Sequence, residues 1–339
     1  MVPTFCPIGP QKVDPTILTF GLTKNDLAEA QNYWSWAHYL TWAAKRMGKI
    51  PLIINLDESP MPLVYDNALG NVVRKRPHFL SAPDRQPRRN VTRQDTRVHY
   101  TYVAAVCNIP WIQNLLPQVL IVPERCMGHA EHSQLLSELP HTVYVLRRRS
   151  MWSNQTIHGQ ILRLLRKILK TRQIQKRHKV IMHLDTFGGH TTQSSLQKMK
   201  SYGYWFCLIP AQMTCMLQPL DVDVFVKIKR IVRSRYVAAS DTVNLSSNAL
   251  KATRALLHAI MCTLVDTDYS STFRRLGLDD EEGPTSATIL SELEWNAFPA
   301  VQRRAPTQAL VQTLTPRRRR INMELLRGCL PPIFYGPGF

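Results

Sequence analysis

Three aspartates stand where apolar segments of the sequence give way to polar ones. Asp57 follows the apolar run that begins at Ile50, Asp185 follows the run "KVIMHL", and Asp221 lies in "MLQPLDVDVF". Aspartates at the ends of neighbouring strands, together with an acid in the first turn of a following helix, converge at one edge of a sheet. Carboxylates are the ligands that Mg²⁺ prefers, and two such ions about 4 Å apart catalyse phosphoryl transfer on nucleic acids. The sequence therefore offers the donors of a two-metal site.

Two aspartates compete for the third position of this site. At about 100° per residue in a helix, Asp221 falls on the stripe that contains Phe225 and Ile228, which is the face expected to pack on the sheet. Asp223 lies nearly opposite, beside Lys227. We therefore assign Asp221 to the site and expect Asp223 to face solvent or to form a surface salt bridge. Any one of these acids alone is equally typical of a turn or a helix cap, so the hypothesis depends on their joint placement.

Alternating strands and helices surround the aspartates. Apolar and β-branched runs predict strands, and apolar residues at helical spacing predict helices. The strand that begins at Ile50 is expected to end on Asp57 and Glu58. Strand–helix alternation in the second half of the chain indicates an α/β fold with parallel neighbours. Strands are predicted at 50–58, 97–111, 117–122, 179–185 and 204–210, and helices at 23–48, 153–173, 190–203, 219–236 and 247–264.

The chain is strongly basic, with 43 Lys and Arg against 24 Asp and Glu and a formal net charge of +19. This balance indicates a polyanionic partner, because nucleic-acid binding depends largely on contacts between cations and phosphates. The helix at 153–173 and a turn-rich insertion before it along the chain carry the candidate contacts, although a charged helical face is also commonly just solvated. The candidates are Arg163, Arg166, Lys167 and Lys170 in the helix, and Arg74, Lys75 and Arg76 in the insertion.

Several longer stretches match the motifs of one family. "NLDES" (55–59), "HLDTFGGH" (183–190) and "IPAQMTCMLQPLDVDVFVKIKR" (209–230) are similar to its three acidic motifs. "VHYTYVAAVCNIPWIQNLLPQVLIV" (98–122) resembles its central hairpin, and "STFRRLGL" (271–278) its closing segment. On these stretches the chain resembles the DDE-superfamily endonucleases, the catalytic domains of pogo, Tigger and Jerky-like transposases in the mariner group.

This resemblance implies an α/β, RNase H-like (retroviral-integrase-like) fold. Such a fold has a mixed sheet flanked by helices, here with an N-terminal helix and a loosely structured C-terminal tail. The resemblance also implies that Asp57, Asp185 and Asp221 are the catalytic, metal-binding acids. They would hold two Mg²⁺ or Mn²⁺ ions for water-driven nicking of a DNA strand and then for attack of a 3′-hydroxyl on target DNA.

Two further residues match family positions beside the acids. Glu58 follows the first aspartate as in the family, which implies a supporting position. His190 matches the family's histidine after the second aspartate, so we expect it to support the site near metal or substrate, or to serve as a structural residue at the start of a helix. Thr186 stands where the family usually has Asn.

The predicted organisation has three parts: an N-terminal helical extension (1–49), the DDE endonuclease domain (50–278) and a Pro- and Arg-rich tail (279–339). Family transposases usually carry helix-turn-helix modules before this domain, and only 56 residues precede Asp57. We therefore expect DNA recognition to involve a second copy of the chain or an upstream DNA-binding partner. The run from Arg317 to Arg320 fits either a nuclear-import signal or a DNA contact, and the first alternative predicts a nuclear protein. No run approaches the roughly 18 to 20 apolar residues of a membrane span, so we expect no membrane partner.

Three functions fit these features. The first is a transposase-type endonuclease and strand transferase. The second is a transposase-derived nucleic-acid-binding protein that keeps the fold without catalysis, and the third is another RNase H-like nuclease that acts on RNA or branched DNA. The intact acids favour the first.

Overall fold

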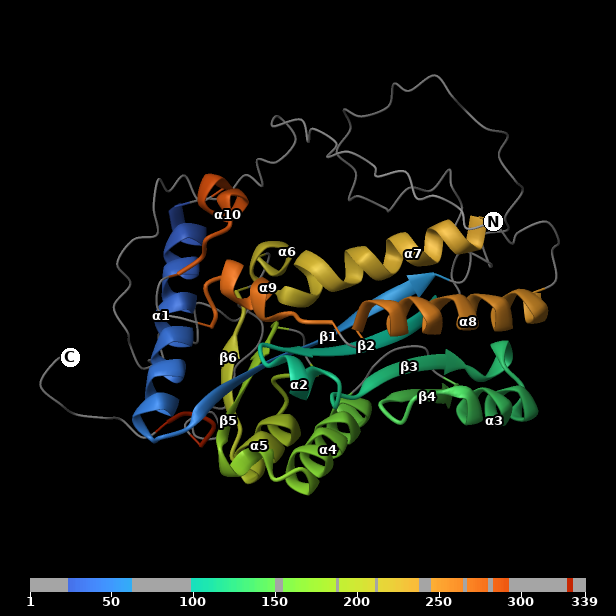
Figure 1. The fold of residues 1–339 in the computed structure, drawn as a ribbon, viewed down its shortest axis with the longest axis horizontal. Coiled ribbons are helices and arrows are strands. Elements are labelled where there is room, and N and C mark those ends of the chain that lie inside the picture. The colour runs from blue at the N-terminus through green and yellow to red at the C-terminus, as the bar shows by residue number, and fades with distance from the viewer. Residues whose placement is uncertain are drawn as a thin grey trace, which may run out of the picture.

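The computed structural model describes residues 24–62, 99–149, 155–186, 189–210, 213–237, 245–264, 267–279, 283–292 and 328–331. Within these ranges the chain forms a six-stranded sheet with helices packed on both faces (Figure 1). The strands are β1 (Ile50–Pro62), β2 (His99–Cys107), β3 (Gln118–Pro123), β4 (Val143–Arg148), β5 (His178–Leu184) and β6 (Trp205–Leu208).

The sheet has the order β4-β3-β2-β1-β5-β6. Strands β1, β2 and β3 are antiparallel neighbours, whereas β5 and β6 run parallel to β1 and β4 runs parallel to β3. An antiparallel β1–β2–β3 meander beside two parallel strands is the arrangement of an RNase H-like sheet. The predicted mixed α/β fold class is therefore confirmed, and β4 is a strand that the sequence patterns did not predict.

Strand β1 is longer than predicted. The prediction that it ends on Asp57 and Glu58 is wrong, because the strand continues to Pro62. The extra length is held by β2, which pairs with β1 from Ile54 onward on the side away from β5. Pairing with β5 stops at Asn55. Asp57 therefore lies just beyond the parallel pairing but inside a continuous strand.

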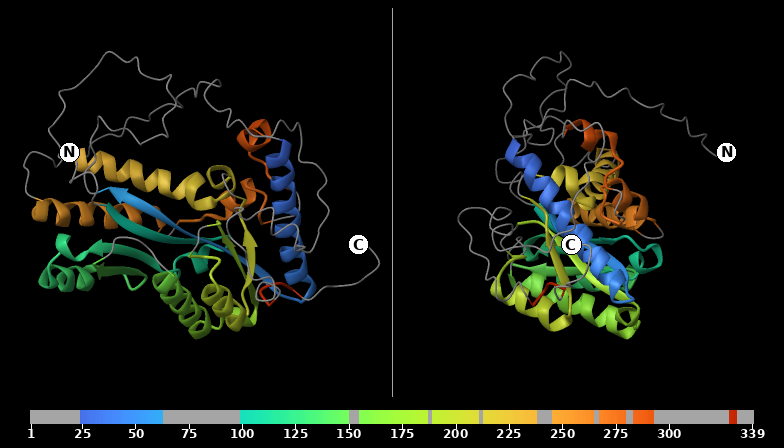
Figure 2. Two further views of the ribbon diagram at one scale, coloured as in Figure 1. Left: turned by 180° about the vertical axis from the view of Figure 1, so that it is seen from behind. Right: turned by 90° about the vertical axis from the view of Figure 1, so that its left-hand side faces the viewer.

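The predicted helices are all present in the described ranges, with some shorter elements between them. Helices α7 and α8 lie on one side of the sheet, and α4 and α5 lie on the other (Figures 1 and 2). The helical elements are α1 (Lys24–Arg46), α2 (Pro110–Gln113), η3 (Glu124–Cys126), α3 (His129–Glu138), α4 (Gln155–Thr171), η4 (Ile174–Lys176), α5 (Gln193–Tyr202), α6 (Thr214–Leu217), η5 (Leu220–Val224), α7 (Phe225–Val237), α8 (Leu245–Leu264), α9 (Ser270–Arg275) and α10 (Ala287–Glu292).

Helix α1 lies beside the β6 edge of the sheet and contributes to the same core (Figure 1). The fully buried Trp34 donates its indole N–H to the carbonyl of Leu276 at 2.9 Å. Trp36 meets Phe206 of β6 edge-on, with 6.0 Å between ring centroids. The predicted boundaries at residues 49 and 278 stay predictions, although α1 and the endonuclease region share these contacts.

Some predicted features fall outside the described ranges. These are the basic insertion with Arg74, Lys75 and Arg76, and the run from Arg317 to Arg320. Within the described ranges, each helix is too short or too polar to cross a membrane.

Candidate metal centre at the edge of the sheet

Two of the three aspartates come from neighbouring parallel strands. Asn55 of β1 and His183 of β5 are direct partners in the sheet, and Asp57 and Asp185 each follow two residues later. Asp57 still lies within β1, whereas Asp185 directly follows the last residue of β5, so both acids lie at the edge where the parallel pairing ends. The Asp185 side chain is 23% exposed and Asp57 is 8% exposed, so solvent reaches the pair only partly.

Asp221 comes from η5, a π-helical turn that leads into α7. The predicted stripe is confirmed, because Phe225, Ile228 and Val232 are buried. The Phe225 N–H bonds the carbonyl of Leu220, five residues earlier, which defines the wider π turn. Such turns often occur at functional sites. The sequence spacing did not predict the π turn, but η5 is short enough for α-helical spacing to select the correct side of the helix.

The three carboxylates perturb one another. Burial, followed by the charges of Asp185 and Asp221, raises the pKa of Asp57 well above its usual value. Burial also raises the pKa of Asp221, and Asp185 adds to this rise, while a hydrogen bond from Thr214 opposes it. The fold therefore gathers the three predicted acids within the range over which their charges interact. The ligand atoms that these three residues offer are all carboxylate oxygens, and such a set suits Mg²⁺ or Mn²⁺.

His190 connects Asp185 to Glu58. Its Nδ1 lies 2.6 Å from Asp185 Oδ1, and its Nε2 lies 3.2 Å from Glu58 Oε2. Burial alone would lower the pKa of His190, but the charge of Glu58 and hydrogen bonds to both carboxylates outweigh it and raise that pKa well above its usual value. The ring bonds Asp185 through Nδ1 and lies within ion-pair distance of Glu58 through Nε2, so it orients Asp185. Both residues predicted to support the site therefore lie against it.

A second buried histidine, His158 of α4, packs against His190 with 4.7 Å between ring centroids. Burial, followed by the charges of His190 and Lys198, lowers the pKa of His158 well below its usual value, so the ring is neutral. The sequence analysis missed His158, because it sits on the apolar face of an amphipathic helix, beside residues such as Ile161 and Leu162. Nothing local in the sequence distinguishes it from a core residue.

Asn55 is a second residue that the sequence analysis missed. It is fully buried on β1. Its Nδ2 donates to the carbonyl of His183 at 2.9 Å, and its Oδ1 accepts the N–H of Leu220 at 3.1 Å. The bonded groups on β5 and η5 lie two residues and one residue before their aspartates. One side chain thus fixes the relative positions of all three segments that carry the acids.

Asp223 lies outside the acidic cluster, as predicted. It pairs with Lys227 at 2.8 Å and accepts a hydrogen bond from Thr272 Oγ1 at 2.7 Å. Burial raises its pKa, but these partners outweigh burial and lower the pKa below its usual value. The predicted salt bridge is confirmed, and at 16% side-chain exposure it is more enclosed than a surface pair.

The basic face predicted on α4 is only partly formed. Arg163, Lys167 and Lys170 are exposed. Arg166 differs from the prediction, because its guanidinium turns toward the body of the protein and donates to the carbonyl of Tyr202 at 2.8 Å. It also stacks over the Tyr202 ring at 5.3 Å. Arg166 therefore joins α4 to α5, and the other three cations remain available to a partner.

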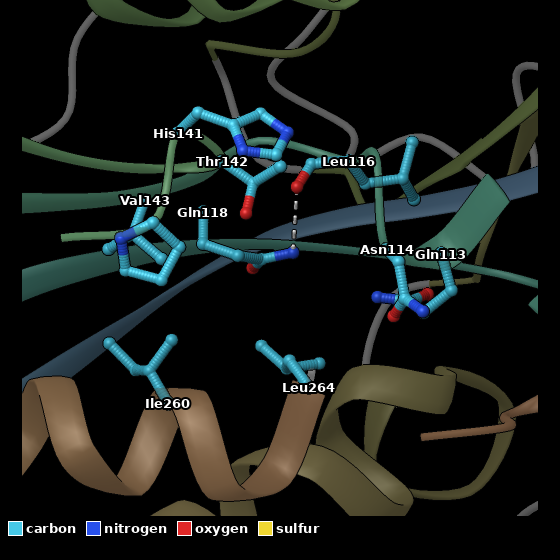
Figure 3. Close-up of a pocket in the computed structure, with 10 residues that line it drawn as sticks. Gln113, Asn114, Leu116, Gln118, His141, Thr142, Val143, Ile260 and Leu264 are labelled. Atoms are coloured by element: carbon cyan, nitrogen blue, oxygen red, sulfur yellow. Dashed lines mark hydrogen bonds between the residues drawn. The ribbon is translucent and has the colours of Figure 1, made fainter. Parts of the chain in front are cut away.

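A pocket of about 220 Å³ lies apart from the aspartates, between α8 and the ends of β3 and β4 (Figure 3). Ile260 and Leu264 form one wall, and Gln118 lies opposite them. The Gln118 amide is already bonded, since its Oε1 accepts from Tyr102 and its Nε2 donates to the carbonyl of Ala105. The Gln118 amide is therefore engaged within the protein, and the pocket lies apart from the acidic edge that carries the candidate chemistry.

Comparison with known proteins finds one family profile that matches part of the chain. The sequence profile of the DDE superfamily endonucleases matches residues 130–266. This range contains Asp185 and Asp221 and begins after the strand that carries Asp57. Among curated proteins, none matches the chain.

Several solved structures are similar to the chain. The Mos1 mariner paired end complex with Mn has 14% sequence identity and a TM-score of 0.38, covering 77% of this chain and 68% of that chain. The Mos1 transposase paired-end complex with left transposon end has 12% identity and a TM-score of 0.39, covering 76% and 67%. A pre-cleavage Mos1 transpososome has 12% identity and a TM-score of 0.37, with the same coverage of 76% and 67%.

Proposed function

We propose that the chain is a metal-dependent DNA endonuclease of the transposase type, since the sequence profile of the DDE superfamily endonucleases matches residues 130–266. Asp57, Asp185 and Asp221 would hold two Mg²⁺ or Mn²⁺ ions. When bound, such ions activate an attacking oxygen and stabilise the leaving oxygen of a phosphodiester. The proposed reaction nicks a DNA strand and then joins a 3′-hydroxyl end to target DNA.

One observation carries this proposal. Three carboxylates from β1, from the end of β5 and from η5 meet closely enough for two of them to raise the pKa of the third. A protein gains no stability from gathering like charges in a partly buried place. An arrangement that collects acids from three distant parts of the sequence is best explained by a cation that they share.

Other residues near the acids position the carboxylates and supply positive charge for DNA. Asn55 holds the strand and turn segments before the acids at fixed separation. His190 donates to Asp185 and keeps that carboxylate in one orientation. The exposed cations of α4, Arg163, Lys167 and Lys170, supply positive charge for phosphates of a bound strand.

The test is nicking of a labelled DNA duplex by the full chain in Mg²⁺ or Mn²⁺. Wild type is expected to nick only with the metal present, and Asp185→Asn is expected to reduce nicking by at least about 100-fold, because a metal ligand is lost. Asp223→Asn is the matched control, since it makes the same change at an acid outside the cluster and should nick within about threefold of wild type. Nicking that survives Asp185→Asn would refute the assignment of the site.

The exposed cations of α4 support a second candidate, a nucleic-acid-binding protein that keeps the fold without catalysis. In that case the chain binds DNA with an affinity that falls steeply with salt, while neither Mg²⁺ nor Mn²⁺ produces nicking. The two measurements on one preparation therefore separate the candidates.

A further inference from the structure

A second cluster of possible metal ligands lies beside the three aspartates. Glu58, His158 and His190 each offer one ligand atom, and these atoms lie within 4.8 Å of one another. Successive side chains on a strand point to opposite faces. Glu58 is therefore directed toward α4 and His190, whereas Asp57 is directed toward η5. The cluster differs from the aspartates in its donors, and it meets them where His190 bonds Asp185.

His158 is the member that most needs an explanation. It is 1% exposed, and neither ring nitrogen has a hydrogen-bond partner within the described ranges. Nearly all buried polar groups in proteins are paired, because leaving one unpaired destabilises the fold. The ring packs against His190 at 4.7 Å between centroids, so its nitrogens lie beside the two other potential ligands. A bound cation would satisfy a nitrogen that nothing else in the described chain satisfies.

We propose that Glu58, His158 and His190 bind a divalent ion of the Zn²⁺ class. Two imidazoles and one carboxylate suit Zn²⁺, whereas an all-oxygen set suits Mg²⁺ or Mn²⁺. Bonds of about 2.0–2.2 Å place tetrahedral ligand atoms roughly 3.3–3.6 Å apart, so modest side-chain rotations close the present spacing. Three protein ligands leave the fourth position to water.

The second nitrogen of His190 is already arranged for this role. His190 would coordinate through Nε2, which faces Glu58, while its Nδ1 stays bonded to Asp185 at 2.6 Å. Histidines that bind metals almost always donate their other ring N–H to a carboxylate or carbonyl, which fixes the orientation of the ring. Asp185 would thus orient the histidine of the zinc site and also serve as a ligand in the proposed site of the three aspartates.

An ion at this position would tie α4 to β1 and to the segment after β5. It would hold His190, and through it Asp185, against the sheet. The zinc site itself does not depend on the proposed function. Only this positioning of Asp185 rests on it.

The first test is the zinc content of the full chain, loaded with Zn²⁺ and washed in excess Mg²⁺ so that the all-oxygen site carries Mg²⁺. Elemental analysis is expected to find one more zinc per chain in wild type than in His158→Phe. Asp221→Asn should keep the wild-type content. His38→Phe is the matched control, because His38 is also buried, at 2% exposure, but its Nε2 lies 2.9 Å from the carbonyl of Gly277 and outside the cluster.

Thermal unfolding then separates loss of the ion from loss of the fold. In chelator, His158→Phe should melt no lower than wild type, because Phe has similar volume and removes two unpaired nitrogens. With Zn²⁺ at about a hundredfold excess over its dissociation constant, wild type should gain roughly 5–10 °C and His158→Phe should gain nothing.

Two results would overturn the zinc site. One is equal zinc content in wild type and His158→Phe, and the other is a zinc that is lost from Asp221→Asn as well. Neither measurement uses DNA. A chain that fails to nick can therefore still hold zinc, and a chain without zinc can still be tested for nicking.

Discussion

Replacing Asn55 by alanine should separate the assembly of the acidic site from the general stability of the sheet. The substitution removes the donor to the His183 carbonyl and the acceptor for the Leu220 N–H. Both residues are buried, at 1% and 0% exposure. The change therefore leaves two buried backbone groups short of a partner, at the points where β5 and η5 are held to β1.

The expected size follows from those two groups. Leaving a buried polar group unpaired costs about 1–3 kcal/mol, and a water molecule in the vacated space can pair with one of them. We expect the free energy of unfolding to fall by about 2–4 kcal/mol, which lowers the Tm by roughly 5–15 °C for a folded region of this size. Displacing a catalytic group by about 1 Å can cost 100-fold in rate, so nicking should fall by about 10- to 100-fold.

Asn108 provides the matched control. It is 7% exposed, its Oδ1 accepts the N–H of Ile53 at 2.9 Å, and its Nδ2 donates to Asp279 at 2.6 Å. Asn108→Ala should lower the Tm by a similar amount but leave nicking and Mn²⁺ affinity within about threefold of wild type. Both variants are assayed at least 10 °C below their own transitions. Equal loss of nicking in the two variants, or normal nicking by Asn55→Ala, would refute the positioning role of Asn55.

Two further outcomes are expected elsewhere in the molecule. Burial lowers the pKa of His183 to about 3. Between about pH 6.5 and 3 the unfolded chain therefore binds a proton at this histidine that the folded chain does not bind. As a result, the free energy of unfolding falls by about 1.4 kcal/mol for each pH unit of acidification. Urea unfolding across this range should show that His183→Gln loses this part of the pH dependence, and an unchanged dependence would contradict the assignment. Arg163→Ala or Lys167→Ala should each reduce the slope of log affinity for DNA against log salt by about 1. Arg166→Ala should instead lower the Tm, because its guanidinium bonds the Tyr202 carbonyl, and equal salt slopes in all three variants would remove α4 from the DNA interface.

Local patterns in the sequence were sufficient to locate the segments that carry the acids. Apolar runs identified β1 and β5, and helical spacing separated Asp221 from Asp223, because both patterns depend on which side chains face one sheet. The end of β1 was misplaced for a related reason. A strand continues as long as a neighbouring strand pairs with it. Beyond Asp57, β1 pairs with β2, and the sequence of β1 alone does not reveal this pairing.

The residues that organise the site could not be found in this way. Asn55 acts through the carbonyl of His183 and the N–H of Leu220, and His158 acts through its contact with His190. These partners are far away in the sequence, and two of the contacts involve backbone atoms that every residue possesses. Such roles depend on the register between β1 and β5 and on the packing of α4, which only the fold specifies.

Asn55 also holds the three acids together against their mutual repulsion, and this effect adds to the stability that its two hydrogen bonds supply. Burial, and then the charges of Asp185, Asp221 and Glu58, raise the pKa of Asp57, so repulsion tends to spread β1, β5 and η5 apart. Without the two hydrogen bonds of Asn55, β1, β5 and η5 would separate and so lower this repulsion. The three acids would then lose the spacing that a shared cation requires. With Asn55 in place the acids stay close, and the raised pKa of Asp57 means that either a proton or a divalent ion must offset their repulsion. The same buried side chain that keeps the acids close thus keeps them at the separation at which one cation can replace that proton.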